Sequence, residues 1–173
     1  MDVLNSFLQI LLPGGLVLLG VYLTVKSFLQ KDFEKRALEL RAQHTETVLP
    51  LRLQAYERVA LLLERSSPHN LILRLNNSAF NAAQLQSTLV SEVREEFNHN
   101  LSQQIYVSME VWALTRNAIE EIIGLINTSA QGIDPEQPSL VLARRIFETL
   151  IERNEDPIDR AMRQLKEEIQ TIF

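Results

Sequence analysis

Cysteine is absent from this sequence of 173 residues, and both histidine and glycine are scarce. Without cysteine there can be no disulfide, no thiolate metal ligand and no thiol nucleophile. The three histidines leave few groups for metal binding or acid–base chemistry. Five glycines, set among long stretches of Leu, Ala, Glu, Gln and Arg, are typical of helices joined by few tight turns. We therefore expect an all-α chain with almost no strand.

Motifs of catalysis and of nucleic-acid binding are also missing. There is no glycine-rich phosphate loop and no nucleophile elbow. The formal net charge of −5 disfavours nucleic acid, which requires a basic surface. One metal-like spacing occurs, Glu96-x-x-His99, but a ferritin-like centre needs a second such motif and two further glutamates. We expect no catalytic residues, no cofactor, no metal, no nucleic-acid partner and no enzymatic activity.

A single long run without charge, Val3 to Val25, stands at the start of the chain. A helix of this length reaches across roughly 30 Å of hydrocarbon, so the sequence predicts a membrane anchor. Lys26, Lys31 and Lys35 follow the run, and only Asp2 and the amino terminus precede it. By the positive-inside rule the N-terminus lies outside and residues 26–173 lie in the cytoplasm. A cleaved signal peptide is the alternative, although the expected basic start and small-residue cleavage site are absent.

The predicted organisation is a transmembrane anchor over residues 1–29, a charged helical stalk over 30–49 and a helical bundle over 50–173. Pro13-Gly14-Gly15 interrupts the anchor, either as a tolerated kink or as a close contact with another helix. Pro50 predicts a bend after the stalk, followed by helix over 50–65. Ser66-Ser67-Pro68 end that helix and can cap the next one. The segment from Asn70 to Leu75 fits either a helical turn or a lone strand, and we predict a helical turn because no partner strand is in view.

Helical spacing continues through the rest of the bundle. The apolar stripes predicted to face inward are Leu49, Leu53, Tyr56, Ala60 and Leu63; Leu85, Leu89, Val93 and Phe97; Leu101, Ile105, Met109 or Ser108, Trp112, Ile119, Ile122 or Ile123, and Ile126; Leu140, Phe147, Leu150 and Ile151; and Ile158, Met162, Leu165, Ile169 and Ile172. Asn98 to Asn100 mark a break or a kink, and residues 128–138 a loop. Ser139 and Asp156 are the predicted N-caps of the last two helices.

Residues 48–75, VLPLRLQAYERVALLLERSSPHNLILRL, resemble the signature of a family of small membrane-anchored proteins of unknown function from Bacteroidetes. The residues that carry the likeness are Arg52, Gln54, Ala55, Tyr56, Glu57, Arg58, Glu64, Arg65 and Arg74. It implies a bacterial inner-membrane protein with one span. The resemblance implies no activity and no site residue.

Six residues of this segment form a candidate partner interface: Arg52, Tyr56, Leu61, Leu62, Arg65 and Arg74. Arginine and tyrosine are enriched at protein interfaces, but salt bridges and hydrogen bonds to the following helices of the same chain are the favoured explanation for them. The apolar run from Val59 to Leu63 covers every side of a helix, so Leu61 and Leu62 need a cover. Either this helix is central in its own bundle, or a second copy or partner covers them, and then Leu62→Glu disrupts assembly without unfolding the bundle.

Two functions fit these observations. The first is a non-enzymatic scaffold or accessory subunit, held in the lipid bilayer by its single span and assembling with itself or with another membrane protein. The second is a membrane-tethered sensor or regulator that binds a ligand or a soluble partner.

Overall fold

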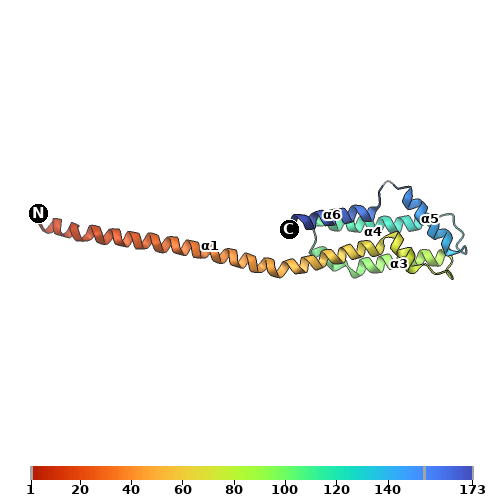
Figure 1. Ribbon diagram of the computed structural model, residues 1–173, viewed down its shortest axis with the longest axis horizontal. Helices are drawn as coiled ribbons and strands as arrows, with labels where there is room; N and C mark the ends of the chain where they lie inside the picture. Colours follow the sequence, from red (N-terminus) through yellow and green to blue (C-terminus); the bar gives the residue numbers. More distant parts are fainter. Residues whose placement is uncertain (1, 154, 173) are drawn as a thin grey trace. The chain divides into compact units, whose positions relative to one another are not determined.

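In the described part of the computed structural model, every regular secondary-structure element is a helix, which confirms the all-α prediction. The structure describes the chain except residues 1, 154 and 173, and it describes no side chains for residues 2–15, 34, 37–47 and 172. The helices are α1 (Asp2–Ser66), α2 (Pro68–Leu75), α3 (Ala82–His99), the 3₁₀ helix η1 (Leu101–Ile105), α4 (Met109–Ala130), α5 (Ser139–Ile151) and α6 (Pro157–Ile172) (Figure 1). Among the described residues, extended pairing is limited to one isolated bridge between Asn81 and Pro138.

The chain divides into two compact units, residues 1–49 and residues 50–173. Helix α1 belongs to both, because its helical assignment continues through Pro50. The helical assignment is therefore not interrupted at this proline, and the bend stays a prediction. A proline inside a helix removes one backbone hydrogen bond, and the strong helix formers that follow, from Arg52 to Arg65, offset that loss.

The first unit displays apolar side chains to solvent. Between Leu16 and Phe33, eleven large apolar residues are at least half exposed. In the part of the chain that the structure describes, no helix is long and apolar enough to cross a membrane. The predicted span from Val3 to Val25 is not supported by that finding, and its first 13 residues, with the Pro13-Gly14-Gly15 interruption, lie outside the described side chains.

The second unit is a bundle of four helices, formed by the end of α1 together with α3, α4 and α6 (Figure 1). Arg65 of α1 pairs with Glu96 of α3, and Arg52, earlier on α1, donates to the Tyr106 carbonyl beyond the end of α3. Ser108 at the start of α4 contacts Glu168 near the end of α6. These contacts make neighbouring helices antiparallel, so the chain runs up, down, up and down. The short helices α2 and α5 pack against each other and close the far end of the bundle.

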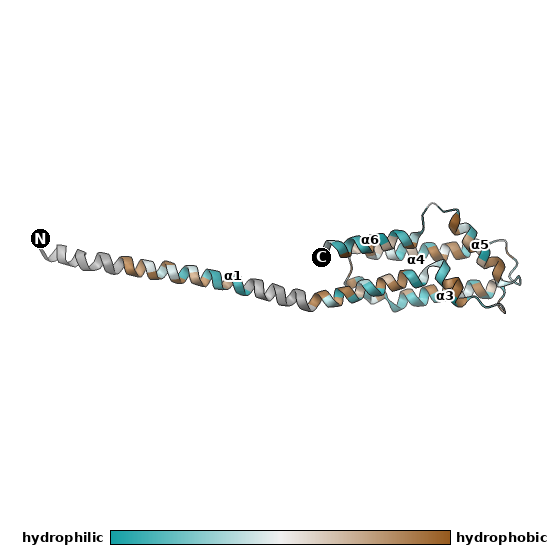
Figure 2. Ribbon diagram, viewed as in Figure 1, coloured by the Kyte–Doolittle hydropathy of each residue, from teal (hydrophilic) through white to brown (hydrophobic). Residues whose placement is uncertain are grey.

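Apolar side chains from every α-helix of this unit meet in one core. Along these helices hydrophobic and hydrophilic residues alternate (Figure 2). Leu85, Leu89 and Val93 are buried as predicted. On α1 the buried set is Ala55, Tyr56, Val59, Leu62, Leu63 and Ser66. The predicted stripe was wrong at Leu53, which is exposed, while Ala60 is partly buried against the core.

Several other predicted core positions are exposed. Met109, Ile105, Leu140 and Ile151 face solvent, while Val111, Leu142, Ala143 and Ile146 are buried in their place. The reason is that α4 and α5 carry apolar residues on more than one face, and only the neighbouring helices select which face is covered.

Helix ends follow local signals. Ser67 caps α2, where its Oγ accepts from the Asn70 amide, and the Asp156 carboxylate accepts from the Ile158 amide at the start of α6, as predicted. Asn81 and Gln84 form a capping box at α3. Ser139 does not cap α5. Its hydroxyl instead donates to Asn76 Oδ1 at 2.8 Å, which joins the two loops at the far end of the bundle.

Candidate functional site

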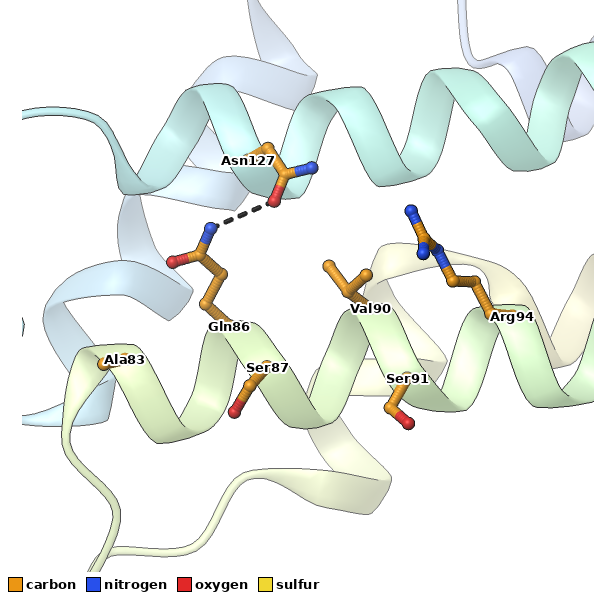
Figure 3. Close-up of a pocket in the computed structure, with 7 residues that line it drawn as sticks. All are labelled: Ala83, Gln86, Ser87, Val90, Ser91, Arg94 and Asn127. Carbon is orange, nitrogen blue, oxygen red and sulfur yellow. Dashed lines mark hydrogen bonds between the residues drawn. The ribbon is translucent and has the colours of Figure 1, made fainter.

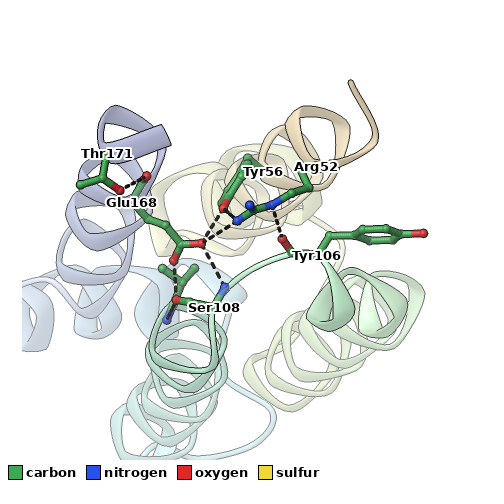
Figure 4. A network of polar contacts seen from close by, with 7 residues as sticks. Arg52, Tyr56, Tyr106, Ser108, Glu168 and Thr171 are labelled. Carbon is green, nitrogen blue, oxygen red and sulfur yellow. Dashed lines mark hydrogen bonds and ion pairs between the residues drawn. The ribbon is translucent and has the colours of Figure 1, made fainter. Parts of the chain in front are cut away.

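A polar network at one end of the bundle connects Arg52 and Tyr56, two residues of the candidate interface, to Ser108 and Glu168 (Figure 4). The Arg52 guanidinium donates to Tyr56 Oη at 2.8 Å and to the Tyr106 carbonyl at 3.2 Å. Tyr56 Oη donates to Glu168 Oε1 at 2.5 Å. We call Arg52, Tyr56, Ser108 and Glu168 the end network.

Three helices supply the end network. Arg52 and Tyr56 lie one turn apart on α1, Ser108 is the N-cap of α4, and Glu168 lies near the end of α6. The Ser108 amide donates to Glu168 Oε1 at 3.0 Å, and the Ser108 hydroxyl donates to Glu168 Oε2 while accepting from the Val111 amide. The carboxylate thus lies at the N-terminus of α4, where the helix dipole favours negative charge.

The pKa values in this network reflect mutual stabilisation. Burial, the hydrogen bond to Glu168 and the charge of that carboxylate raise the pKa of Tyr56 above its ordinary value, against the opposing effect of Arg52. Burial favours a higher pKa for Glu168, but hydrogen bonds from Ser108 and Tyr56 and the charge of Arg52 outweigh it. The pKa of Glu168 is consequently held below its ordinary value. The groups satisfy one another, which suits a structural clamp better than a proton-transfer site.

A second cluster joins α1 and α2 to α3. Arg65 Nε donates to Glu96 Oε2 at 2.8 Å, its Nη2 lies 3.9 Å from Glu92, and Arg74 also pairs with Glu92. Glu96 is therefore engaged by an arginine. Within the described residues there is no group of three or more carboxylates, histidines or cysteines that could hold a metal ion.

Of the six residues of the candidate interface, some have side chains buried in the core and others have exposed side chains. Leu62 is 0% exposed and Tyr56 2%, so the chain's own core covers both. This is the central-helix alternative, and no partner is needed to cover Leu62. Leu61 is 51% exposed, and Arg52, Arg65 and Arg74 make the internal ion pairs described above. That any of these residues contacts a partner stays a prediction.

An open hollow of about 430 Å³ lies between α3 and α4 (Figure 3). Gln86 donates to Asn127 across it at 3.0 Å, Val90 lies in its middle, and the Arg94 guanidinium extends toward α4. Its lining contains neither a carboxylate nor a histidine. This hollow can offer hydrogen bonds and one positive charge, but it has no acid–base pair.

Sequence reasoning missed Glu168, Ser108 and Glu92. Ser108 has the ordinary signature of an N-cap, a serine directly before a helix, and that signal could have been used. Glu168 lies three residues after the buried Leu165, on the flank of the apolar stripe of α6. No local sequence signal predicts that Glu168 contacts Tyr56, which is 112 residues away in the chain.

The fold and its polar clusters define a helical-bundle protein preceded, along the same first helix, by an apolar exposed segment. The chain belongs to a family of unknown function, DUF7935, whose model matches residues 2–172. This agrees with the resemblance in residues 48–75, while the bacterial source and the membrane anchor stay predictions. No curated protein and no solved structure matches the chain.

Proposed function

We propose that this protein is a non-enzymatic, single-span membrane protein whose helical bundle acts as a scaffold or accessory subunit of a membrane complex. The observation that carries the proposal is the exposed apolar surface of α1 between Leu16 and Phe33. Burying a Leu or Val side chain is worth about 1.5–3 kcal/mol, so leaving this surface in water forgoes on the order of 10 kcal/mol. A lipid bilayer is the cover that fits, because exposed apolar side chains occur on every side of the helix.

The orientation that we propose has the N-terminus outside and the bundle in the cytoplasm. Lys26, Lys31, Lys35 and Arg36 follow the apolar segment, and positive charges next to a span stay on the cytoplasmic side. The end network and the arginine–glutamate pairs support a scaffold role, because their titratable groups are paired with one another. Such pairs hold helices together and leave no free base.

Single-cysteine labelling tests the span and its orientation together, because the natural chain has no cysteine. We expect Asp2→Cys to react with an impermeant maleimide in intact cells. Gln131→Cys, at an exposed position after α4, should react only once the membrane is opened. Ser129 is unsuitable as a probe since its side chain is buried.

Two lysines placed in the apolar segment provide the control. Leu16→Lys and Leu19→Lys should each make the free energy of membrane insertion about 2.5–3.5 kcal/mol less favourable. Together they should move the protein out of the membrane fraction. The matched pair Leu73→Lys with Leu140→Lys, at exposed leucines of the bundle, should leave it there. Labelling of Gln131→Cys in intact cells would refute the orientation, and a natural chain that stays soluble would refute the anchor.

Purification in mild detergent tests the scaffold role. A fixed stoichiometric assembly, with copies of itself or with another membrane protein, is expected to survive size-exclusion chromatography. A monomer that carries a bound small molecule would contradict the scaffold and favour the sensor. Native mass spectrometry distinguishes the two outcomes by mass.

A further inference from the structure

We propose that a hollow between α1 and α3, bounded by Arg58, Leu61, Arg65 and His99, binds an oxyanion, either a carboxylate or a phosphate group. The hollow has a volume of about 300 Å³, and Glu96 and Asn100 complete its lining. The proposal goes beyond the membrane-anchoring role and does not depend on it.

Two facing stripes build the hollow. Arg58, Leu61 and Arg65 are spaced by three and four on α1, so they lie on one side of that helix. Glu96 and His99 lie one turn apart at the end of α3. Because the two helices are antiparallel, Arg65 reaches Glu96, while Arg58 lies toward the end of α3 that carries His99 and Asn100.

The charges in the hollow do not cancel. Glu96 is the only carboxylate in its lining, and both of its oxygens are engaged: Oε2 by Arg65 Nε at 2.8 Å and Oε1 by Asn100 Nδ2 at 3.4 Å. Asn100 is itself buried and is held by the backbone oxygen of Glu96 at 2.9 Å. Arg58 is exposed, and among the described residues it has no hydrogen bond or ion pair. The lining therefore carries two guanidinium groups against one carboxylate, in a chain whose formal net charge is −5.

An oxyanion is the ligand that this arrangement suits. Guanidinium groups present several N–H donors in a plane and pair with carboxylate and phosphate oxygens through charge-assisted hydrogen bonds. Arg65 is already oriented by Glu96 and has its Nη2 3.9 Å from Glu92, so Arg58 is the arginine of the hollow that has the least competition from carboxylates. The fixed position of Arg65 lowers the entropic cost of its joining Arg58 in binding an anion. The half-exposed Leu61 lies on the wall between the two arginines, so an apolar group beside the anion gains a contact.

Nuclear magnetic resonance on the full chain in a neutral detergent tests the proposal with two probes. One is inorganic phosphate, and the other is acetyl-leucyl-glutamate amide, with acetyl-leucyl-glutamine amide as its uncharged control. At constant ionic strength we expect saturable shifts at Arg58, Arg65 and His99, with a dissociation constant on the order of 1 mM. Tighter binding of phosphate indicates a phosphate ligand, and tighter binding of the glutamate peptide indicates a carboxylate next to an apolar group.

Three substitutions make the test decisive. Arg58→Gln should weaken binding about tenfold, whereas Arg144→Gln, at an exposed arginine of α5 outside the hollow, should leave it unchanged. Glu96→Gln removes the competing negative charge and should tighten binding several-fold. The proposal is overturned if neither probe shifts these residues at concentrations about tenfold above 1 mM, or if Arg58→Gln and Glu96→Gln bind like the natural chain.

Discussion

Leu62→Glu is expected to unfold the bundle. Leu62 is fully buried in the core, so the substitution removes a packed apolar side chain and leaves an unpaired carboxylate in its place. Losing the packing alone costs about 2–5 kcal/mol, and the buried charge adds several more. The free energy of unfolding of a native protein is only about 5–15 kcal/mol in total, so little folded bundle should remain.

The adjacent leucine is the matched control. Leu61 is 51% exposed, and a glutamate there lies between Arg58 and Arg65 on the same side of α1. We expect Leu61→Glu to change the free energy of unfolding by less than about 1 kcal/mol. Trp112, the only tryptophan in the sequence, stacks on Phe97 with ring centroids 5.6 Å apart, so its fluorescence reports on the bundle alone. A Leu62→Glu bundle as stable as the natural one would mean that the core described above does not form.

Glu168→Gln is expected to destabilise the bundle by about 1–3 kcal/mol at neutral pH, because the donors of Ser108 and Tyr56 lose a charged acceptor. The pKa of Glu168 is lowered in the folded state, so its contribution is present above the carboxyl's unfolded value of about 4.3. The contribution is lost as the pH falls through the lower folded pKa. The difference in free energy of unfolding between the natural chain and the variant should thus be constant from neutral pH down to about 5 and should vanish in stronger acid.

The neighbouring residue again provides a control, since Glu167 is exposed and lies outside the end network. Urea unfolding of Glu168→Gln and Glu167→Gln, followed by Trp112 fluorescence across the acid range, separates a general charge effect from loss of the clamp. An equal loss of stability in both variants, or a Glu168→Gln difference that persists in strong acid, would contradict the assignment. At alkaline pH the sign reverses for Tyr56: because its pKa is raised in the folded state, its contribution is fully present below the ordinary pKa and is lost as the pH rises from there through the folded pKa.

Local signals in the sequence were sufficient for the helices and for several of their boundaries. Ser67 with Pro68 and Asp156 with Pro157 start helices where the capping rules place them. The regular four-residue spacing of Leu85, Leu89 and Val93 identified the buried face of α3, because polar residues occupy its other faces.

Local signals failed where a helix has two apolar faces. Leu61 and Leu62 are chemically identical neighbours, and only the positions of α3 and α6 determine that one is exposed and the other buried. The same holds for Leu140 against Leu142 on α5. The end network could not be predicted from the sequence for a related reason, since Arg52 and Tyr56 contact Glu168 only once the whole bundle has folded. Sequence spacing defines neighbours within one helix and does not define neighbours across 112 residues.

That contact between the first and last helices has a consequence for biosynthesis. Tyr56 Oη donates to a carboxylate 112 residues further along the chain. At about 5–20 residues per second, a ribosome needs on the order of ten seconds to make the intervening segment. Throughout that interval the inner face of α1, with Val59 and Leu62, has been synthesised while the helix that completes its cover has not. The nascent chain must therefore keep an apolar face from aggregating until α6 emerges, and this favours assistance by chaperones over spontaneous, stepwise folding from the N-terminus.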